Sequence, residues 1–148
     1  MSSAQAARVR CAGVLLVRGD RVLLGRRHAH RRWYPGVWDV VGGRIEDGES
    51  PLDTARREAT EELDVQLATA DLTRLDTVRT AELELTTFAS AAWTGEVRNA
   101  APDEHDELAW VTLPDLEHLA LALPELVELA RAGLATQSRT SEGRSPRR

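Results

Sequence analysis

The stretch from Gly42 to Val65, which reads GGRIEDGESPLDTARREATEELDV, decides the fold. It sets Glu58, Glu61 and Glu62 at i, i+3 and i+4, positions that are neighbours on a helix surface. Each like-charge pair at this spacing costs an exposed helix about 0.2–0.5 kcal/mol. A bound cation would offset the repulsion. The simpler alternative is a solvated helix face on which neighbouring arginines neutralise the carboxylates.

The residues around these glutamates predict an amphipathic helix. Ser50 suits the N-cap, Pro51 suits the first helical position, and Asp53 can complete a capping box. A core-facing stripe at i, i+3, i+7 and i+11 consists of Leu52, Ala55, Ala59 and Leu63. Carboxylates on the other side of such a helix are hard oxygen ligands, the type that Mg²⁺ and Mn²⁺ prefer.

A longer pattern favours the cation over the solvated face. Gly43 is followed after five residues by Glu49, and after seven more by the run REATEELDV, which starts at Arg57. This pattern resembles the Nudix box, G-x5-E-x7-R-E-U-x-E-E-x-G-U, in which U is apolar. The one departure is Asp64, where the family usually has a glycine in the left-handed backbone conformation. Asp tolerates that conformation, so we expect a modest stability cost and intact chemistry.

The resemblance implies a fold, a reaction and a cofactor. Nudix proteins hydrolyse a nucleoside diphosphate linked to another group, X, with a divalent metal. We therefore expect an α/β fold, the Nudix α/β/α sandwich with a mixed sheet, and Mg²⁺ as cofactor, with Mn²⁺ as the alternative. The domain is expected at residues 1–135. Residues 136–148 are polar and basic without a hydrophobic face, so we expect a disordered tail.

Matching positions carry the family's metal ligands to named residues. Glu58, Glu61 and Glu62 are implied to bind the metal, and a backbone carbonyl of Gly42 or Gly43 is implied to add a further ligand.

The resemblance also implies a catalytic set. An ion pair between Glu49 and Arg57 would orient the helix carboxylates. In some relatives the general base is a glutamate of the helix, for which Glu61 is the candidate here. In others the base comes from a later loop, where we favour Glu104.

The later loop offers several other charged groups. Asp106 and Glu107 follow Glu104 closely, and Glu96 precedes it. His105 lies among them, and a surface histidine is the expectation, with a proton shuttle as the alternative.

Substrate binding is expected outside the helix. Arg26 and Arg27 lie where many nucleotide-hydrolysing relatives have a phosphate-binding arginine, and a guanidinium binds phosphate oxygens bidentately. Trp33 and Tyr34 offer rings on which a base can stack. The amide of Asn99 can both donate to and accept from a purine edge.

Composition limits the classes of partner. The 148 residues suffice for one domain, and a net charge of −5 argues against nucleic acid as the partner. No apolar run reaches about 20 residues, so we expect no membrane span, and a cytoplasmic location follows as the default. The single Cys11 is expected to be a buried thiol. Homodimers are frequent in the family.

The rest of the chain reads as strands and short helices. Two apolar runs at 9–17 and 21–25 flank a Gly-Asp turn and predict a β-hairpin. Further strands are expected at about 72–80, 82–94 and 108–112, followed by two short helices that Pro124 separates.

The substrate expected by resemblance is a (deoxy)nucleoside triphosphate or an oxidised one such as 8-oxo-dGTP, cleaved to the monophosphate and pyrophosphate. ADP-ribose or another nucleotide sugar is the alternative within the family, and a dinucleotide polyphosphate is a further one. A non-catalytic nucleotide-binding Nudix module is the alternative from a different class. The isopentenyl diphosphate isomerase branch fits poorly, because Cys11 lies in a predicted strand rather than near the Tyr34 loop.

Overall fold

A computed structural model describes residues 7–143 of the chain. Within this range the strands are β1 (Val9–Arg18), β2 (Arg21–Arg27), β3 (Trp38–Asp39), β4 (Val41–Arg44), β5 (Thr73–Arg74), β6 (Val78–Arg79), β7 (Leu83–Ser90) and β8 (His105–Val111). The helices are α1 (Pro51–Leu63), α2 (Leu113–Leu116) and α3 (Leu126–Gly143), with a 3-10 turn at Thr69–Asp71.

Strand β1 lies at the centre of a mixed sheet. It pairs in parallel with β7, from Val9 opposite Leu83 to Leu16 opposite Ser90. Along its other edge it pairs antiparallel with β4 and then, at its end, with β2. Strand β2 also pairs with β3 and β8, and β7 pairs with β5 and β6, all antiparallel. The combination of parallel and antiparallel pairs confirms the mixed sheet.

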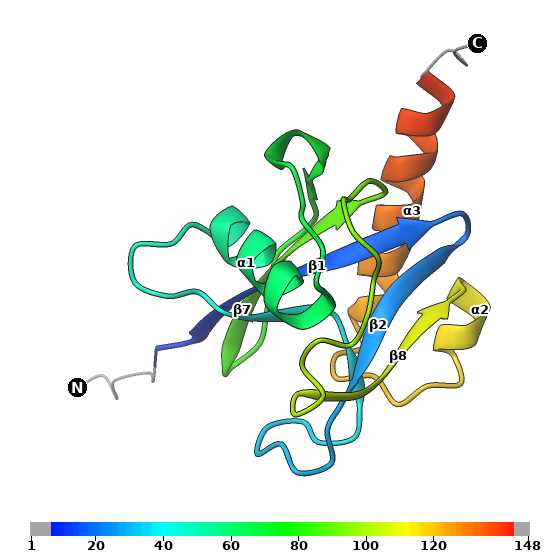
Figure 1. Cartoon of the computed structure of the whole chain (residues 1–148). Coiled ribbons are helices and arrows are strands. Elements are labelled where there is room, and N and C mark those ends of the chain that lie inside the picture. The colour runs from blue at the N-terminus through cyan, green and yellow to red at the C-terminus, as the bar shows by residue number, and fades with distance from the viewer. Residues whose placement is uncertain (1–6, 144–148) are drawn as a thin grey trace.

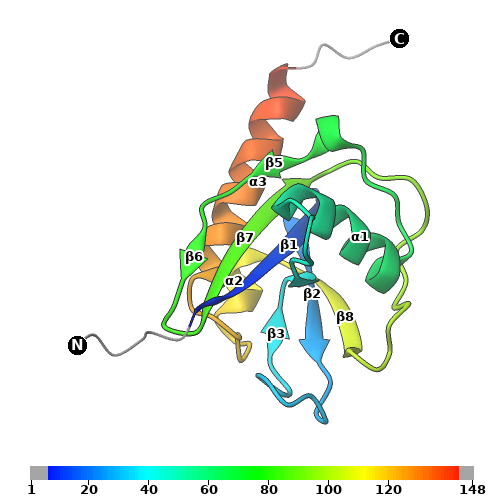
Figure 2. The same ribbon diagram turned by 90° about the vertical axis from the view of Figure 1, so that its left-hand side faces the viewer.

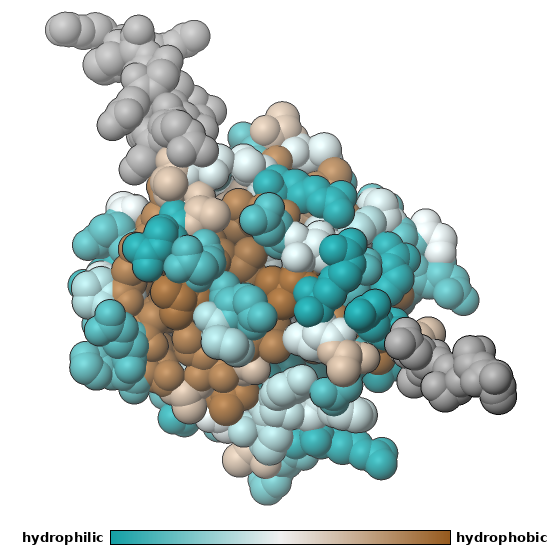
Figure 3. Space-filling model, turned by 180° about the vertical axis from the view of Figure 1, so that it is seen from behind, coloured by the Kyte–Doolittle hydropathy of each residue, from teal (hydrophilic) through white to brown (hydrophobic). Residues whose placement is uncertain are grey.

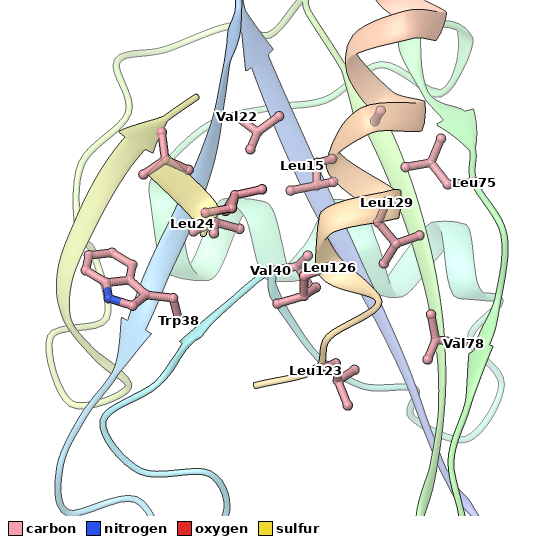
Figure 4. Packing of buried hydrophobic residues seen from close by; sticks show 14 of the residues in the cluster. Leu15, Val22, Leu24, Trp38, Val40, Leu75, Val78, Leu123, Leu126 and Leu129 are labelled. Atoms are coloured by element: carbon pink, nitrogen blue, oxygen red, sulfur yellow. The ribbon is translucent and has the colours of Figure 1, made fainter. Parts of the chain in front are cut away.

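Helices cover both faces of this sheet, so the expected α/β/α sandwich is confirmed (Figures 1 and 2). On one face, α1 packs Ala59 and Leu63 against the sheet. On the other face, Leu126 and Leu129 of α3 pack against a larger cluster that includes Leu15 (Figure 4). The acidic helix therefore has a buried apolar side and a second side free for polar chemistry.

The ends of α1 confirm the expected capping. The Ser50 hydroxyl accepts from the backbone N–H of Asp53, and the Asp53 carboxylate accepts from the backbone N–H of Ser50. Asp64 takes the left-handed conformation at the C-cap, with φ 59° and ψ 39°. Its backbone N–H donates to the carbonyl of Thr60, so this aspartate does the task of the family's glycine.

The predicted hairpin is confirmed as β1 and β2, which meet at a turn where Gly19 has a φ of 60°. Cys11, on β1, is half-buried and packs against the core, and burial raises the pKa of its thiol. The expected strand at 72–80 is divided into β5 and β6, and β7 ends at Ser90, earlier than expected.

The C-terminal segment differs from the expectation. Two helices flank Pro124, as predicted, but α3 continues to Gly143. Residues 136–143 of the expected disordered tail are therefore helical, while 144–148 lie outside the described residues. No proline interrupts α3, and extending an established helix costs little compared with starting one.

The side that α3 covers carries a broad apolar surface (Figure 3). A groove of about 680 Å³ there is lined by residues of α3, the β1–β2 turn and the start of α2, among them Leu113, Arg131 and Leu134. None of the predicted site residues lines this groove. Among the described residues, no helix combines the length and apolarity needed to cross a membrane.

Candidate active site

Arg57 organises one end of the acidic helix. Its Nε donates to Oε2 of Glu49 at 2.7 Å, and its Nη2 donates to Oε1 of Glu49 at 3.0 Å. Nη1 donates to Glu58 at 2.7 Å and to Glu61 at 3.1 Å, while Nη2 also reaches the backbone carbonyl of Arg44 at 3.1 Å. The expected contact between Glu49 and Arg57 is thus present. One guanidinium holds three carboxylates and the preceding strand together.

The Glu49 carboxylate is fully engaged within the protein. Besides Arg57, the Thr54 hydroxyl donates to it at 2.7 Å, and the backbone N–H of Glu46 donates at 3.1 Å. The hydrogen bonds from Arg57, then those from Thr54 and Glu46, lower the pKa of Glu49 to about 2. Glu49 is therefore an ionised anchor for the loop.

Glu58 and Glu62 form a buried pair of carboxyl groups, which we call the acidic pair. Their side chains are only 10% and 1% exposed. A side chain on Gly43 would collide with Glu58, because its Cβ would lie 2.6 Å from Oε2. The glycine of the motif therefore lets the carboxylate lie against the loop backbone. Gly42 meets a different need, since a Cβ there would lie 2.2 Å from the carbonyl oxygen of Ala12 in β1.

Glu61 is far more exposed than the acidic pair, although it shares Nη1 of Arg57 with Glu58. Its side chain is 56% exposed and pairs with Arg57 at 3.1 Å. The role of Glu58, Glu61 and Glu62 as metal ligands stays a prediction. The described residues whose ligand atoms lie within 4.8 Å of one another are Glu62, Glu104 and His105. The i+3 step carries Glu61 further round the helix toward solvent, where the guanidinium holds it.

His105 is buried against Glu62, so the expectation of a surface histidine is wrong. Its side chain is 3% exposed, and its Nε2 forms a short hydrogen bond with Oε1 of Glu62. Nδ1 of His105 and Oε2 of Glu62 are buried without a hydrogen-bond partner. Burial, followed by the charges of Arg31 and Arg27, lowers the pKa of His105 to about 4. Burial, followed by the adjacent Glu58 carboxyl, raises the pKa of Glu62.

Glu104 stands at the open side of this cluster. Its side chain is 42% exposed and lies 3.6 Å from Arg31. Burial raises the pKa of its carboxyl. The loop that carries it is fixed by Asn99, whose Nδ2 donates to the carbonyl of His105 at 2.7 Å and whose Oδ1 accepts from the backbone N–H of Ala101 at 3.2 Å. Both polar ends of the Asn99 amide are thus used in the loop, which counts against its expected contact with a base.

The two arginines of β2 also have partners in the protein. Arg26 binds Asp106 at 2.7 Å and lies 3.6 Å from Glu107. Arg27 donates to the backbone carbonyls of Trp33 and Tyr34. Arg27 therefore shapes the loop, while the 40% exposed side chain of Arg26 stays accessible from solvent.

The two aromatic residues of that loop differ in exposure. Trp33 is 55% exposed, the largest exposure among the described large hydrophobic side chains. Tyr34 is half-buried and has a φ of 51°, a left-handed conformation that Arg27 supports by holding its carbonyl. Trp33 is thus the ring that a ligand can reach.

A family comparison agrees with the motif and the fold. Residues 7–132 match the family model described as "NUDIX domain". The chain belongs to the Nudix family. An octanoyltransferase of Myxococcus xanthus is 35% identical over 137 residues, which cover 84% of this chain and 37% of that protein. A dihydroneopterin triphosphate diphosphatase of Escherichia coli is 38% identical over 55 residues, or 37% of each chain.

The chain thus spans between 37% and 44% of the length of the first curated relatives that it matches. Among solved structures, a MutT NUDIX hydrolase from Burkholderia pseudomallei has a TM-score of 0.71 and 29% identity. That match covers 84% of this chain and 96% of the other. The Nudix domain of Shewanella oneidensis NrtR, complexed with ADP ribose, has a TM-score of 0.67 at 22% identity, which shows the shared fold.

The side chains of this Nudix site fit a divalent cation. The acidic pair offers carboxylate oxygens, and Oε2 of Glu62 is buried without a partner. A buried polar atom of this kind is costly unless something satisfies it. Hard oxygen ligands of this type suit Mg²⁺ and Mn²⁺.

Proposed function

We propose that this protein is a metal-dependent Nudix pyrophosphohydrolase that cleaves a (deoxy)nucleoside triphosphate, with oxidised forms such as 8-oxo-dGTP included, to the monophosphate and pyrophosphate. The observation that carries the proposal is the buried acidic pair, which sits in a Nudix box whose supporting contacts are all made. The MutT and dihydroneopterin triphosphate relatives support a nucleotide or a similar triphosphate as substrate.

Glu58 and Glu62 would hold the cation, with Glu61 adding a ligand from the exposed side and a carbonyl of Gly42 or Gly43 adding another. When bound, a Mg²⁺ or Mn²⁺ ion polarises a phosphoryl oxygen and lowers the pKa of a water molecule. Arg57 holds Glu58 and Glu61 in place and also anchors Glu49. Its proposed role is to position these carboxylates.

Glu104 is the proposed general base. Its carboxyl lies at the open side of the cluster, and its pKa is raised, which makes it a better proton acceptor than an unperturbed carboxylate. Water oxygen attacks phosphorus, its proton passes to Glu104, and the bond from phosphorus to the bridging oxygen breaks. Pyrophosphate then leaves with the electron pair of that bond.

Arg26 and Trp33 are the proposed contacts to the substrate. An exposed guanidinium can exchange Asp106 for phosphate oxygens, and the exposed indole can stack on a base. Arg27 and Tyr34 act by shaping the loop between them.

The test is hydrolysis of a panel of nucleotides with Mg²⁺, followed by chromatography of the products. The panel contains 8-oxo-dGTP, the ordinary (d)NTPs, ADP-ribose and dinucleotide polyphosphates. Glu61→Gln and Glu62→Gln run beside the wild type, with the exposed Glu117→Gln as a matched control on α2's C-terminal end. We expect one triphosphate to give monophosphate and pyrophosphate, with loss in both site variants.

Other outcomes would redirect the proposal. Cleavage of ADP-ribose alone would replace the triphosphate by a nucleotide sugar. A folded wild type that binds Mn²⁺ and hydrolyses nothing on the panel would contradict the proposed substrates, and nucleotide binding without turnover would favour the non-catalytic module.

A further inference from the structure

We propose that His105 is a positioning residue for Glu62: its Nε2–H donates to Oε1 and so directs Oε2 toward the divalent cation. This inference rests on the proposed function, because it needs Glu62 to be a metal ligand. It adds a residue that lies outside the Nudix box.

The first support is that the two carboxylate oxygens of Glu62 differ in their hydrogen bonding. Oε1 is hydrogen-bonded to Nε2 of His105, whereas Oε2 is buried without a partner. Glu62 comes from the last turn of α1, and His105 starts β8, 43 residues later. A carboxylate held on one oxygen by a rigid ring cannot rotate freely, so its second oxygen has a defined direction.

The second support is the way in which the imidazole is held. A Cβ on Gly25 in β2 would lie 2.6 Å from Nδ1 and 3.0 Å from both Cγ and Cε1 of His105. The ring therefore lies against the bare backbone of β2, and no larger residue fits at position 25 while the ring stays there. This contact turns Nδ1 toward the sheet and Nε2 toward Glu62.

The backbone of His105 is fixed from both sides as well. Its N–H donates to the carbonyl of Ala101 at 3.1 Å, and its carbonyl accepts from the Asn99 amide at 2.7 Å. Asn99 and Gly25 thus both position His105: Asn99 fixes its backbone, and Gly25 leaves room for its ring.

Glu58 and Glu62 are held in similar ways, each by a hydrogen bond and by a close contact that a glycine makes possible. Glu58 lies against Gly43 and accepts from Arg57, while Glu62 accepts from a ring that lies against Gly25. Hydrogen bonds that orient metal ligands are commonly worth 10- to 100-fold in metal affinity. We expect His105 to contribute in this range.

The experiment is a Mn²⁺ titration of the full chain, followed by electron paramagnetic resonance of the free ion. Wild type, His105→Gln, His105→Leu and Gly25→Ala are compared. Gln keeps an N–H donor, so it should retain Mn²⁺ affinity within a few-fold. Leu fills the site without an N–H donor, so His105→Leu should lose roughly 10- to 100-fold in Mn²⁺ affinity. Gly25→Ala keeps the histidine but displaces its ring, so it should lose affinity as Leu does.

Gly25→Ala and His105→Leu should both act by removing the same hydrogen bond. The double variant should therefore bind Mn²⁺ no more weakly than the worse of the two single variants. Additive losses would overturn the inference. So would equal affinity of His105→Gln and His105→Leu for Mn²⁺. A wild type without Mn²⁺ affinity would instead remove the metal role of Glu62, and with it the proposed function.

A second measurement does not depend on the variants folding. In Mg²⁺-loaded wild type with ¹⁵N-labelled histidine, the His105 ring should carry its proton on Nε2, with Nδ1 unprotonated. A proton on Nδ1 alone would overturn the inference, because Nε2 could then not donate to Glu62.

Discussion

The acidic helix and the loop before it hold their carboxylates in two ways. On the side of Arg57, each carboxylate of Glu49, Glu58 and Glu61 accepts from the guanidinium. On the side of His105, the carboxyl of Glu62 meets a ring whose pKa is lowered, and one of its oxygens has no partner. We call the Arg57 side the complete side, because each of its three carboxylates has a hydrogen-bond donor within the chain. We call the His105 side the incomplete side, because Oε2 of Glu62 has none.

This difference explains why like charges gather on α1. Arg57 neutralises the repulsion where the helix meets solvent, so that side forms without a ligand. Burial keeps Glu62 away from water, and among the described residues its ion-pair partner is His105 rather than an arginine, which is costly for a charged carboxyl. The unsatisfied end is therefore the one at which a cation contributes most.

Glu62→Gln breaks the incomplete side and should have the largest effect. We expect a loss of at least about 100-fold in kcat/KM, because the amide cannot replace a carboxylate as metal ligand. The metal-free variant should nevertheless unfold at a higher temperature than wild type. Parallel activity assays and thermal unfolding in a chelator would measure both effects.

The stability gain has a defined pH dependence. The folded pKa of Glu62 is raised above the ordinary 4.5, so its contribution to stability is present below pH 4.5 and is lost as the pH rises. Glu62→Gln should therefore exceed wild type in stability above that pH and approach it below. A variant that is less stable than wild type at neutral pH would contradict the account of this side.

Arg57→Lys breaks the complete side. Lysine keeps the charge but lacks the planar fork that binds Glu49 through two nitrogens. We expect the free energy of unfolding to fall by about 1–2 kcal/mol, a value that allows for the partial exposure of the network. Urea unfolding would measure this change, and Arg131→Lys, at an exposed position of α3, is the matched control.

Glu49→Gln sharpens the comparison through pH. Hydrogen bonds from Arg57 first, and from Thr54, lower the folded pKa of Glu49 to about 2 from 4.5. Its contribution is thus present above pH 4.5 and is lost as the pH falls toward 2, the opposite sense to Glu62. The variant should lose less stability than wild type between pH 4.5 and 2 in acid titrations followed by circular dichroism.

Glu61→Gln should have the smallest effect on stability. Its exposed pair with Arg57 resembles surface ion pairs, so the free energy of unfolding should change by less than about 0.5 kcal/mol. The loss of activity should be smaller than that of Glu62→Gln. Equal losses in the two variants would show that Glu61 moves into the acidic pair when metal binds.

The complete side was largely predictable from the sequence. Local spacing predicted the capping box at Ser50, while the resemblance to the Nudix box implied the left-handed position of Asp64 and the contact between Glu49 and Arg57. Such contacts need no knowledge of distant strands. The hairpin of β1 and β2 was predictable for the same reason.

The incomplete side was not predictable from local rules. His105 meets Glu62 only because β8 pairs with β2 in a register that shifts at Arg26 and Arg27. The sequence around His105 is charged and gives no sign of burial. The proximity of Gly25 could have served as a signal only after that register was known.

The most direct test of the account is a crystal structure with Mn²⁺, in which anomalous scattering locates the ion. We predict a peak about 2.0–2.2 Å from carboxylate oxygens of both Glu58 and Glu62, with Oε2 of Glu62 among them and Oε1 still bonded to His105. A peak bound only by exposed carboxylates such as Glu61 and Glu104, with Glu62 still away from the ion, would contradict it.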